Sequence, residues 1–215
     1  MQKIAIIGAG GLGLEIKMLI DQINKHSKAW DFVGFYDDNP KVISAKHPNQ
    51  IIGPIERIND LKSRIAFIIA IGDPKIKAQI FSRISNGKYI WYPSLIHPNV
   101  YVDNTNKIGE GTIITAGNQL TVNIDLKNHV LLNLNCTVGH NVIIDDFSSI
   151  MPGANISGNI KLGKKVLVGS GATLINECII GDNSIVGAGA VVLKNIPENT
   201  VVAGVPSKPL IRKTK

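Results

Sequence analysis

Aromatic residues, cysteines and long apolar runs are all scarce in this sequence of 215 residues. Aromatics make up 5% of it, so we expect a core built mainly from aliphatic side chains. Two cysteines are too few for a disulfide framework, and no apolar run approaches the ~18 residues of a membrane-spanning helix. The apolar run near the N-terminus is too short for the core of a signal peptide. These absences predict a cytoplasmic globular protein with no membrane span.

The formal net charge is +7, but the basic residues are scattered, apart from a small cluster at the C-terminus. No basic stretch carries interleaved aromatic residues, the pattern typical of nucleic-acid binding. We therefore expect no nucleic-acid partner. A solvated basic surface is the favoured interpretation, and attraction of small anionic ligands such as nucleotides is the alternative.

The second half of the chain has a repeat of six residues. Every sixth residue from Ile96 to Val192 is isoleucine, leucine or valine, over 17 consecutive positions. A period of six fits neither a helix nor an ordinary strand. It predicts a parallel β-solenoid of short strands joined by tight corners. The pattern resembles the hexapeptide repeat of the left-handed parallel β-helix, with three hexads, or about 18 residues, in each coil.

The first part of the chain alternates predicted strands with predicted helices. Residues 3–8, 32–36 and 65–71 have the composition of strands, and helix-like apolar spacing follows the first and the third of them. This alternation predicts a small parallel α/β domain of Rossmann-like type over residues 1–92. The β-helix domain then covers residues 93–215.

A glycine-rich segment follows the first predicted strand. Gly8, Gly10 and Gly13 have the G-x-G-x-x-G spacing, and Asp37 ends the second strand, where a carboxylate can hold a ribose. The domain is too short for two mononucleotide halves, so a mononucleotide or sugar-nucleotide site is favoured over a structural turn and over NAD. In each case, backbone N–H groups at a helix N-terminus suit phosphate.

His140 is the histidine with the clearest potential for chemistry. It occupies the third place of its hexad, where the side chain should point outward and act as a general base near neutral pH. Steps of one coil from His140 lead to Gly158, Asn176 and Lys194. We expect these residues to form one column with rungs ~4.8 Å apart. Taken alone, a histidine that points outward is more often a solvent-exposed residue with no role in chemistry.

Other columns and side chains of the repeat are weaker candidates for chemistry than this histidine. Gly153, Gly171 and Gly189 also lie one coil apart, which fits both corner turns and a smooth groove for an extended ligand. No second histidine shares the column of His140, so no metal site is expected. Cys136 and Cys178 occupy small-residue places of the repeat, which favours buried packing over a nucleophilic thiol.

Motifs along nearly the whole chain resemble the bacterial sugar O-acyltransferase family, which contains sialic acid O-acetyltransferases and nucleotide-sugar N-acetyltransferases. The resemblance depends on the following segments: Gly8–Gly13, Phe35–Asp38, Ala70–Asp73, Leu132-Asn133, His140, Asp146–Ser148, Gly158-Asn159 and Val202–Lys208.

The resemblance implies direct acetyl transfer from acetyl-CoA to an amino group of a nucleotide-linked sugar of the 4-amino-4,6-dideoxy type. His140 matches the family base, Asn141 stands beside it, and a backbone N–H near Gly158 would stabilise the oxyanion. Family members are homotrimers with active sites between subunits, and no metal takes part. An O-acetyltransferase acting on sialic acid, an NAD-binding protein and an inactive scaffold remain as alternatives.

The resemblance also implies two sets of binding residues. The nucleotide sugar would contact Gly10, Gly11, Leu12, Gly13, Asp37, Asp38, Gly72 and Asn133. Acetyl-CoA would contact Ser149, Gly158, Ser170, Gly187, Ala188, Gly189, Lys194, Pro206 and Lys208. Three positions depart from the bacillosamine-type members: Asn141 replaces a glutamate, and Ser149 and Leu12 each replace a histidine.

Overall fold

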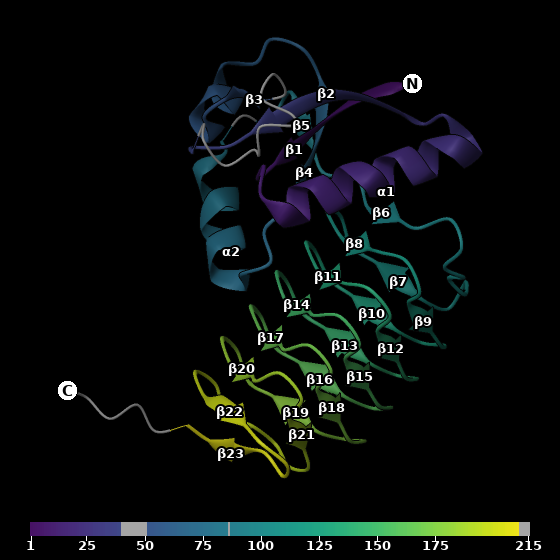
Figure 1. Cartoon of the computed structure of the whole chain (residues 1–215), viewed down its shortest axis with the longest axis vertical. Coiled ribbons are helices and arrows are strands. Elements are labelled where there is room, and N and C mark those ends of the chain that lie inside the picture. The colour runs from purple at the N-terminus through teal and green to yellow at the C-terminus, as the bar shows by residue number, and fades with distance from the viewer. Residues whose placement is uncertain (40–50, 86, 211–215) are drawn as a thin grey trace, which may run out of the picture. The chain divides into compact units, whose positions relative to one another are not determined.

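The computed structural model describes residues 1–39, 51–85 and 87–210 (Figure 1). Tertiary contacts divide the chain into two units, Met1–Pro98 and Asn99–Lys215. The change in sequence pattern at Tyr92-Pro93-Ser94 lies slightly earlier, because the segment that includes strand β6 (Leu95–Ile96) groups with the first unit. In the described part of the chain, no helix is both long and apolar enough to span a membrane.

The first unit contains a five-stranded parallel sheet in the order β3-β2-β1-β4-β5. Its elements are β1 (Gln2–Ile7), α1 (Gly11–Ser27), β2 (Trp30–Tyr36), β3 (Ile51–Gly53), the 3-10 helix η2 (Ile55–Asp60), β4 (Ile65–Ile69), α2 (Pro74–Arg83) and β5 (Ile90–Trp91). The order of strands reverses at β1, which pairs with both β2 and β4. In open α/β sheets, such a switch point is where ligands bind, beyond the carboxyl ends of the strands.

Aliphatic burial explains why these segments form a sheet with helices. All five residues of β4 are buried, as are the last four of β1, as expected for central strands of a parallel sheet. Ile16, Leu19 and Ile20 form the buried face of α1. Helix α2 begins at an N-cap, Asp73, whose carboxylate accepts hydrogen bonds from the N–H groups of Lys75 and Ile76.

Lys77 of α2 is an unusual part of this unit because its side chain is only 2% exposed. Burial lowers its pKa from 10.5 to about 7, although the charge of Asp73 partly opposes the shift. Between these two values, the unfolded chain binds more protons than the folded one. The free energy of unfolding therefore rises with pH in this window and loses this dependence below about pH 7.

We expect Lys77→Met to remove this dependence. Between pH 7.5 and 9, the wild type should gain about 2 kcal/mol of unfolding free energy relative to the variant, since one pKa unit corresponds to about 1.4 kcal/mol. Urea denaturation of both proteins at the two pH values measures the difference. Equal pH slopes for wild type and variant would show that Lys77 is charged in the folded protein.

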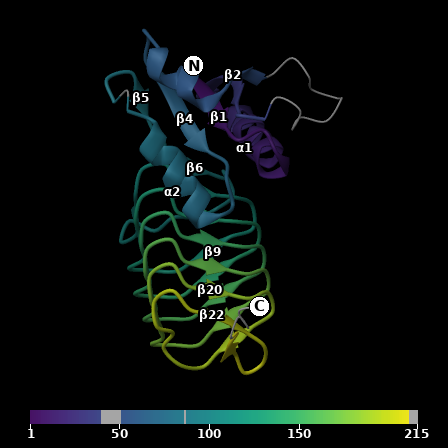
Figure 2. The same cartoon turned by 90° about the vertical axis from the view of Figure 1, so that its left-hand side faces the viewer.

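The second unit is a parallel β-helix, and its successive coils are visible in Figure 2. Most of its strands are two residues long: β7 (Lys107–Ile108), β8 (Ile113–Ile114), β9 (Gln119–Leu120), β10 (Asp125–Leu126), β11 (Leu131–Leu132), β12 (Thr137–Val138), β13 (Ile143–Ile144), β14 (Ser149–Ile150), β15 (Asn155–Ile156), β16 (Lys161–Leu162), β17 (Leu167–Val168), β18 (Thr173–Leu174), β19 (Ile179–Ile180), β20 (Ile185–Val186), β21 (Val191–Val192), β22 (Val201–Ala203) and β23 (Lys208–Pro209).

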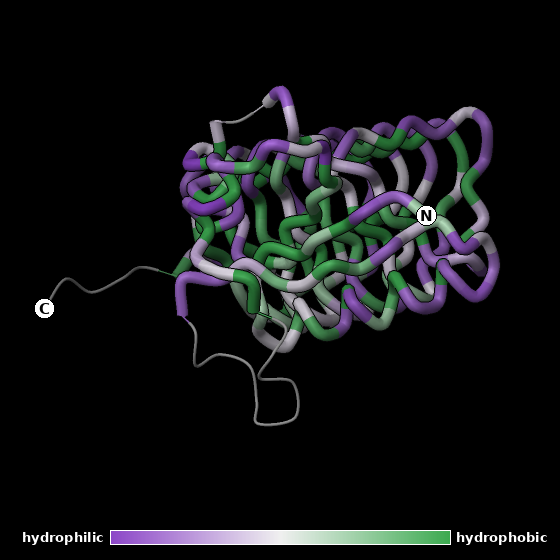
Figure 3. The backbone as a smooth tube through the Cα atoms, turned by 90° about the horizontal axis from the view of Figure 1, so that it is seen from above, coloured by the Kyte–Doolittle hydropathy of each residue, from purple (hydrophilic) through white to green (hydrophobic). Residues whose placement is uncertain are grey.

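The register of the β-helix confirms the predicted coil. Thr137 pairs with Asn155 and Val138 with Ile156, so each strand lies beside the strand one coil later. Two of the sheets follow the orders β19-β16-β13-β10-β7 and β21-β18-β15-β12-β9. The third runs β23-β22-β20-β17-β14-β11-β8 within the second unit. The sixth-position aliphatics fill the interior, and hydrophobic and hydrophilic stretches alternate along the turns in Figure 3.

Both cysteines lie in this interior as free thiols. The Cys136 thiol contacts the carbonyl oxygens of Asn133 at 3.1 Å and Met151 at 3.2 Å. Burial raises the pKa of Cys136 to about 11, so its thiol is neutral at physiological pH. These features fit packing residues.

Candidate active site

His140 lies at the corner that links β12 to β13, and its side chain is exposed as predicted. Its ring lies directly over the backbone of Gly158, one coil further on. A Cβ at Gly158 would stand 2.7 Å from both Cε1 and Nε2 of the imidazole. Glycine is therefore the residue that lets the ring occupy this position. The structure thus brings together two of the three predicted catalytic residues.

Asn141, the third predicted catalytic residue, connects His140 to the neighbouring coils. Its Nδ2 lies 3.2 Å from Nδ1 of His140. Asn123, Asn141 and Asn159 stand one coil apart in left-handed corner conformations, and their side chains bond in series: Asn123 donates to Asn141, which donates to Asn159. Sequence reasoning missed Asn123 and assigned no role to Asn159, although steps of one coil from Asn141 lead to both.

Two hollows of the β-helix lie beside this corner. One, of about 250 Å³, is on the face of β9, β12 and β15 and includes Gly139 and Ser157. The other, of about 360 Å³, is on the face of β7, β10 and β13 and includes Asn123, Asn141 and Asp125. The chain neighbours of His140 thus line both hollows, Gly139 the first and Asn141 the second.

A third hollow, of about 330 Å³, lies near the end of the β-helix. It brings together three of the residues predicted to bind acetyl-CoA, Lys194, Pro206 and Lys208, with apolar neighbours such as Leu193. Lys194 follows β21, whose strand is in register with β18, so it lies about three coils from His140, roughly 14 Å at ~4.8 Å per rung. Two ammonium groups beside an apolar wall suit a ligand that carries phosphates and a base.

The other predicted acetyl-CoA residues differ in exposure. Ser170, Ala188 and Gly189 are exposed, Gly187 is half-buried, and Ser149 is fully buried. A buried Ser149 offers no surface to a ligand in this structure.

The predicted column of glycines has features both of corner turns and of an open groove for an extended ligand. Gly153, Gly171 and Gly189 have φ of 71°, 67° and 65°, which favours glycine. Nothing lies within 4 Å of a Cβ placed at Gly171 or Gly189, so this edge is also open.

Glycine has a clear structural role in the loop after β1. Gly8 has φ of 99°, and a Cβ at Gly13 would collide with the carbonyl of Gly8. Gly10 and Gly11 face open space, and no side chain caps the N-terminus of α1 at Gly10. The loop follows β1 and Gly72 follows β4, so both stand at the switch point of the sheet.

Asp37 connects the end of β2 to this glycine loop. Its Oδ2 accepts a hydrogen bond from the N–H of Ala9, and its Oδ1 accepts one from the N–H of Asn39, both at 2.8 Å. These contacts give Asp37 a structural role beside the predicted ribose contact, which stays a prediction.

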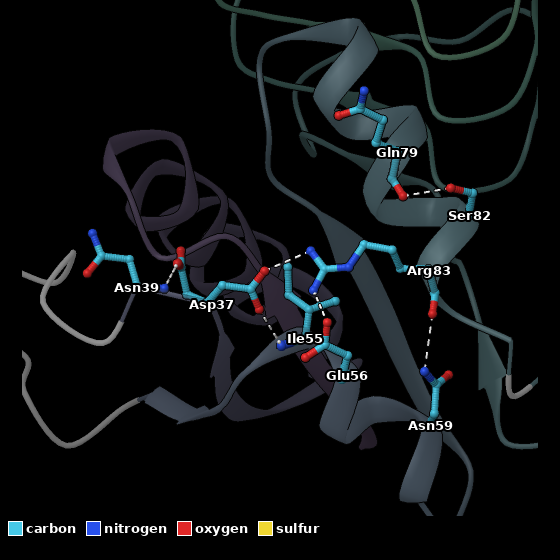
Figure 4. Close-up of polar contacts among 9 residues, drawn as sticks. Asp37, Asn39, Ile55, Glu56, Asn59, Gln79, Ser82 and Arg83 are labelled. Atoms are coloured by element: carbon cyan, nitrogen blue, oxygen red, sulfur yellow. Dashed lines mark hydrogen bonds and ion pairs between the residues drawn. The ribbon is translucent and has the colours of Figure 1, made fainter.

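Asp38 joins a polar network around Arg83. Figure 4 labels Arg83 with two other members of this network, Glu56 and Ile55. Arg83 bonds Asp38 at 2.7 Å and Glu56 at 2.6 Å, and Asp38 also accepts from the N–H of Ile55 at 3.0 Å. The hydrogen bond from Arg83 holds the pKa of Asp38 below its usual value. Both carboxylate oxygens of Asp38 are thus engaged with η2 and α2. Sequence reasoning missed Arg83, which is far from Asp38 along the chain.

The remaining predicted substrate residues lie in different environments. Leu12 and Gly72 are half-buried, and Asn133 is buried, with its Oδ1 accepting from the N–H of Leu134. His129, which the repeat would allow to face solvent, is buried and stacks on Phe147 at 5.1 Å between ring centres. The described residues contain no group of three or more His, Cys, Asp or Glu that could hold a metal ion.

Both units match known families. Residues 3–84 match the PglD N-terminal domain, and residues 159–194 match the bacterial transferase hexapeptide family (six repeats). The UDP-N-acetylbacillosamine N-acetyltransferase of Bacillus subtilis (strain 168) is 32% identical over 119 residues, which are 54% of this chain and 52% of that protein. The match thus spans about half the length of this curated relative.

Solved structures match over almost the whole chain. The acetyltransferase domain of PglB from Neisseria gonorrhoeae FA1090 is 31% identical with a TM-score of 0.87, over 98% of this chain and 100% of that one. The same domain in complex with acetyl coenzyme A is 32% identical with a TM-score of 0.86, over 97% of this chain and 99% of that one. WeeI from Acinetobacter baumannii AYE is 28% identical with a TM-score of 0.85, over 98% and 100%. These matches confirm the predicted fold, and the chain belongs to the hexapeptide-repeat family of bacterial sugar acetyltransferases.

Proposed function

We propose that the protein transfers an acetyl group from acetyl-CoA to the amino group of a nucleotide-linked sugar, with His140 as general base. The observation that supports this most directly is the exposed imidazole seated over the backbone of Gly158. Two relatives are named as N-acetyltransferase or acetyltransferase, and one of them is solved with acetyl coenzyme A.

The transfer would be direct. The amine nitrogen attacks the thioester carbonyl carbon while His140 takes the amine proton, and a carbon–nitrogen bond forms. The carbonyl oxygen becomes an oxyanion that the backbone N–H of Gly158 stabilises. When the oxyanion collapses, the carbon–sulfur bond breaks, and the CoA thiolate leaves and takes up a proton.

Acetyl-CoA would bind along the β-helix. Its phosphates would meet Lys194 and Lys208 in the hollow near the end of the β-helix, where Pro206 also lies. The extended arm would run past the open edge at Gly171 and Gly189 toward His140. Ser170, Gly187 and Ala188 belong to this proposed path, and Ser149 belongs only if it becomes exposed.

The nucleotide sugar would bind the first unit at the switch point of its sheet. Backbone N–H groups of the Gly10–Gly13 segment suit the diphosphate, and Asp37 and Asp38 stand at the end of the neighbouring strand. A 4-amino-4,6-dideoxy sugar is our preferred acceptor, with Leu12 and Gly72 as further contacts in this unit. The substrate contact expected at Asn133, in the β-helix, stays a prediction.

We further propose a homotrimer. The hollows beside His140 are open, and a site that excludes water needs a second wall, which a neighbouring subunit would supply. The free thiols fit a cytoplasmic location.

A CoA-release assay tests the proposed function. Acetyl-CoA is offered with a panel of nucleotide-linked amino sugars, the corresponding hydroxyl sugars and sialic acids. We expect release with an amino sugar and little with the others. Release with sialic acid alone would establish an O-acetyltransferase, and no release with any acceptor would contradict acetyl transfer to sugars.

Direct transfer also predicts the role of Cys136. Because its thiol is buried and neutral, we expect Cys136→Ala to keep kcat within about twofold of the wild type. Rates measured while acetyl-CoA and acceptor are both varied should give intersecting lines. Cys178→Ala is the matched control, since it removes the other buried thiol. Parallel lines together with an inactive Cys136→Ala would establish an acyl-enzyme on this cysteine.

A further inference from the structure

The amide of Asn141 is held in one orientation by the coils on both sides of it. Its Oδ1 accepts a hydrogen bond from Nδ2 of Asn123 at 3.1 Å, and its Nδ2 donates to Oδ1 of Asn159 at 3.0 Å. If the amide of Asn141 alone were turned, its Nδ2 would face Nδ2 of Asn123, and its Oδ1 would face Oδ1 of Asn159. Two donors would then face each other on one side and two acceptors on the other. These three side chains, which we call the asparagine ladder, therefore reverse only together.

The asparagine ladder determines which group faces His140. Nδ2 of Asn141 has a second N–H and lies 3.2 Å from Nδ1 of the imidazole. A neutral imidazole has one protonated nitrogen and one lone pair, and a donor facing Nδ1 favours the lone pair at that atom. The proton is then on Nε2. In the reversed ladder, Oδ1 of Asn141 would face Nδ1 and favour the proton there.

We propose that the asparagine ladder selects the tautomer of His140, with Asn123 and Asn159 as positioning residues that act through Asn141. This inference rests on the proposed role of His140 as base. The edge of the ring over Gly158 is formed by Cε1 and Nε2, so Nε2 is the nitrogen that would accept the acceptor's proton. It has a free lone pair only in the reversed ladder. Reversal lets Nε2 release its proton to solvent while Nδ1 gains one from solvent.

The present direction of the ladder has an electrostatic reason at its far end. One coil beyond Asn159 stands Glu177, in the same left-handed corner conformation, with φ of 69°. An ionised carboxylate accepts hydrogen bonds and cannot donate them. Because the column ends at the carboxylate of Glu177, it favours the direction in which the N–H groups of the asparagine ladder point toward Glu177.

Two matched variants test the proposal. Asn123→Asp and Asn159→Asp each add one negative charge one coil from Asn141, and aspartate tolerates the left-handed corner. A carboxylate at position 123 cannot donate to Asn141, so it attracts Nδ2 of Asn141 and reverses the ladder. A carboxylate at position 159 accepts from Asn141 and keeps the present direction.

The tautomer is measured in nitrogen-15 spectra of histidine-labelled protein at a pH where the imidazole is neutral, with His140 identified by the signal lost in His140→Ala. We expect the ratio of Nδ1–H to Nε2–H to rise about fivefold in Asn123→Asp and to fall in Asn159→Asp, a factor that corresponds to about one hydrogen bond. In parallel, kcat should rise in the first variant and fall in the second, with KM unchanged.

If the added negative charge acted only through its electrostatic field, the ratio of Nδ1–H to Nε2–H would change in the same direction in both variants. That result would overturn the proposal, and so would an unchanged ratio in both variants. The spectra need no substrate, so their outcome is independent of the acetyl transfer. Full turnover by His140→Ala would instead refute the proposed base, whatever the ladder does.

Discussion

Replacing His140 by alanine is expected to lower kcat by about 10²–10⁴-fold, the range for loss of a general base. The side chain is exposed and fills no core space, so the melting temperature should change little. Steady-state kinetics with acetyl-CoA and an amino-sugar nucleotide, together with a thermal melt, measure both effects.

Asn176→Ala is the matched control for this experiment. Asn176 is also exposed and stands in the same column, two coils from His140, and no step of the reaction is assigned to it. Its kcat should remain that of the wild type. Equal turnover in His140→Ala and Asn176→Ala would remove His140 from the mechanism.

The sequence predicted the β-helix because a coil of fixed length turns linear spacing into spatial proximity. Val138 and Ile156 are one coil apart in sequence and are paired partners in the sheet. The same arithmetic predicts that Gly158 lies beneath His140, as the structure shows. It also places the three residues of the asparagine ladder in one column, but asparagine is an ordinary corner residue, so the spacing alone does not indicate a role for them.

The first unit was less predictable because its contacts are not periodic. The pairing of Arg83 with Asp38 depends on how α2 returns to the sheet, and no spacing rule indicates it. In the β-helix, Ser149 and His129 are buried at positions that the repeat would allow to face outward, and His129 stacks on Phe147 one coil further on. The repeat predicts which side chains point outward from a coil, but it does not show which outward positions are covered.

The contact between His140 and Gly158 leads to the second large expected effect. A Cβ at Gly158 would stand 2.7 Å from the imidazole, closer than such atoms approach, so the ring must move. The obstacle is the far end of an exposed side chain, which can give way without unfolding the coil. We therefore expect Gly158→Ala to keep its melting temperature close to that of the wild type and to lower kcat about 100-fold, the cost of misplacing a catalytic group by about 1 Å.

A double-mutant cycle separates this displacement from the other ways in which Gly158 could act. If Gly158→Ala works by moving the imidazole, the same substitution should leave the residual rate of His140→Ala unchanged, because there is no ring left to displace. If the two losses instead multiply, Gly158 contributes through its own backbone, as the oxyanion donor or as part of the path of acetyl-CoA. An unchanged kcat in Gly158→Ala would show that the imidazole works equally well away from Gly158. The position of the ring over this glycine would then have no role in catalysis.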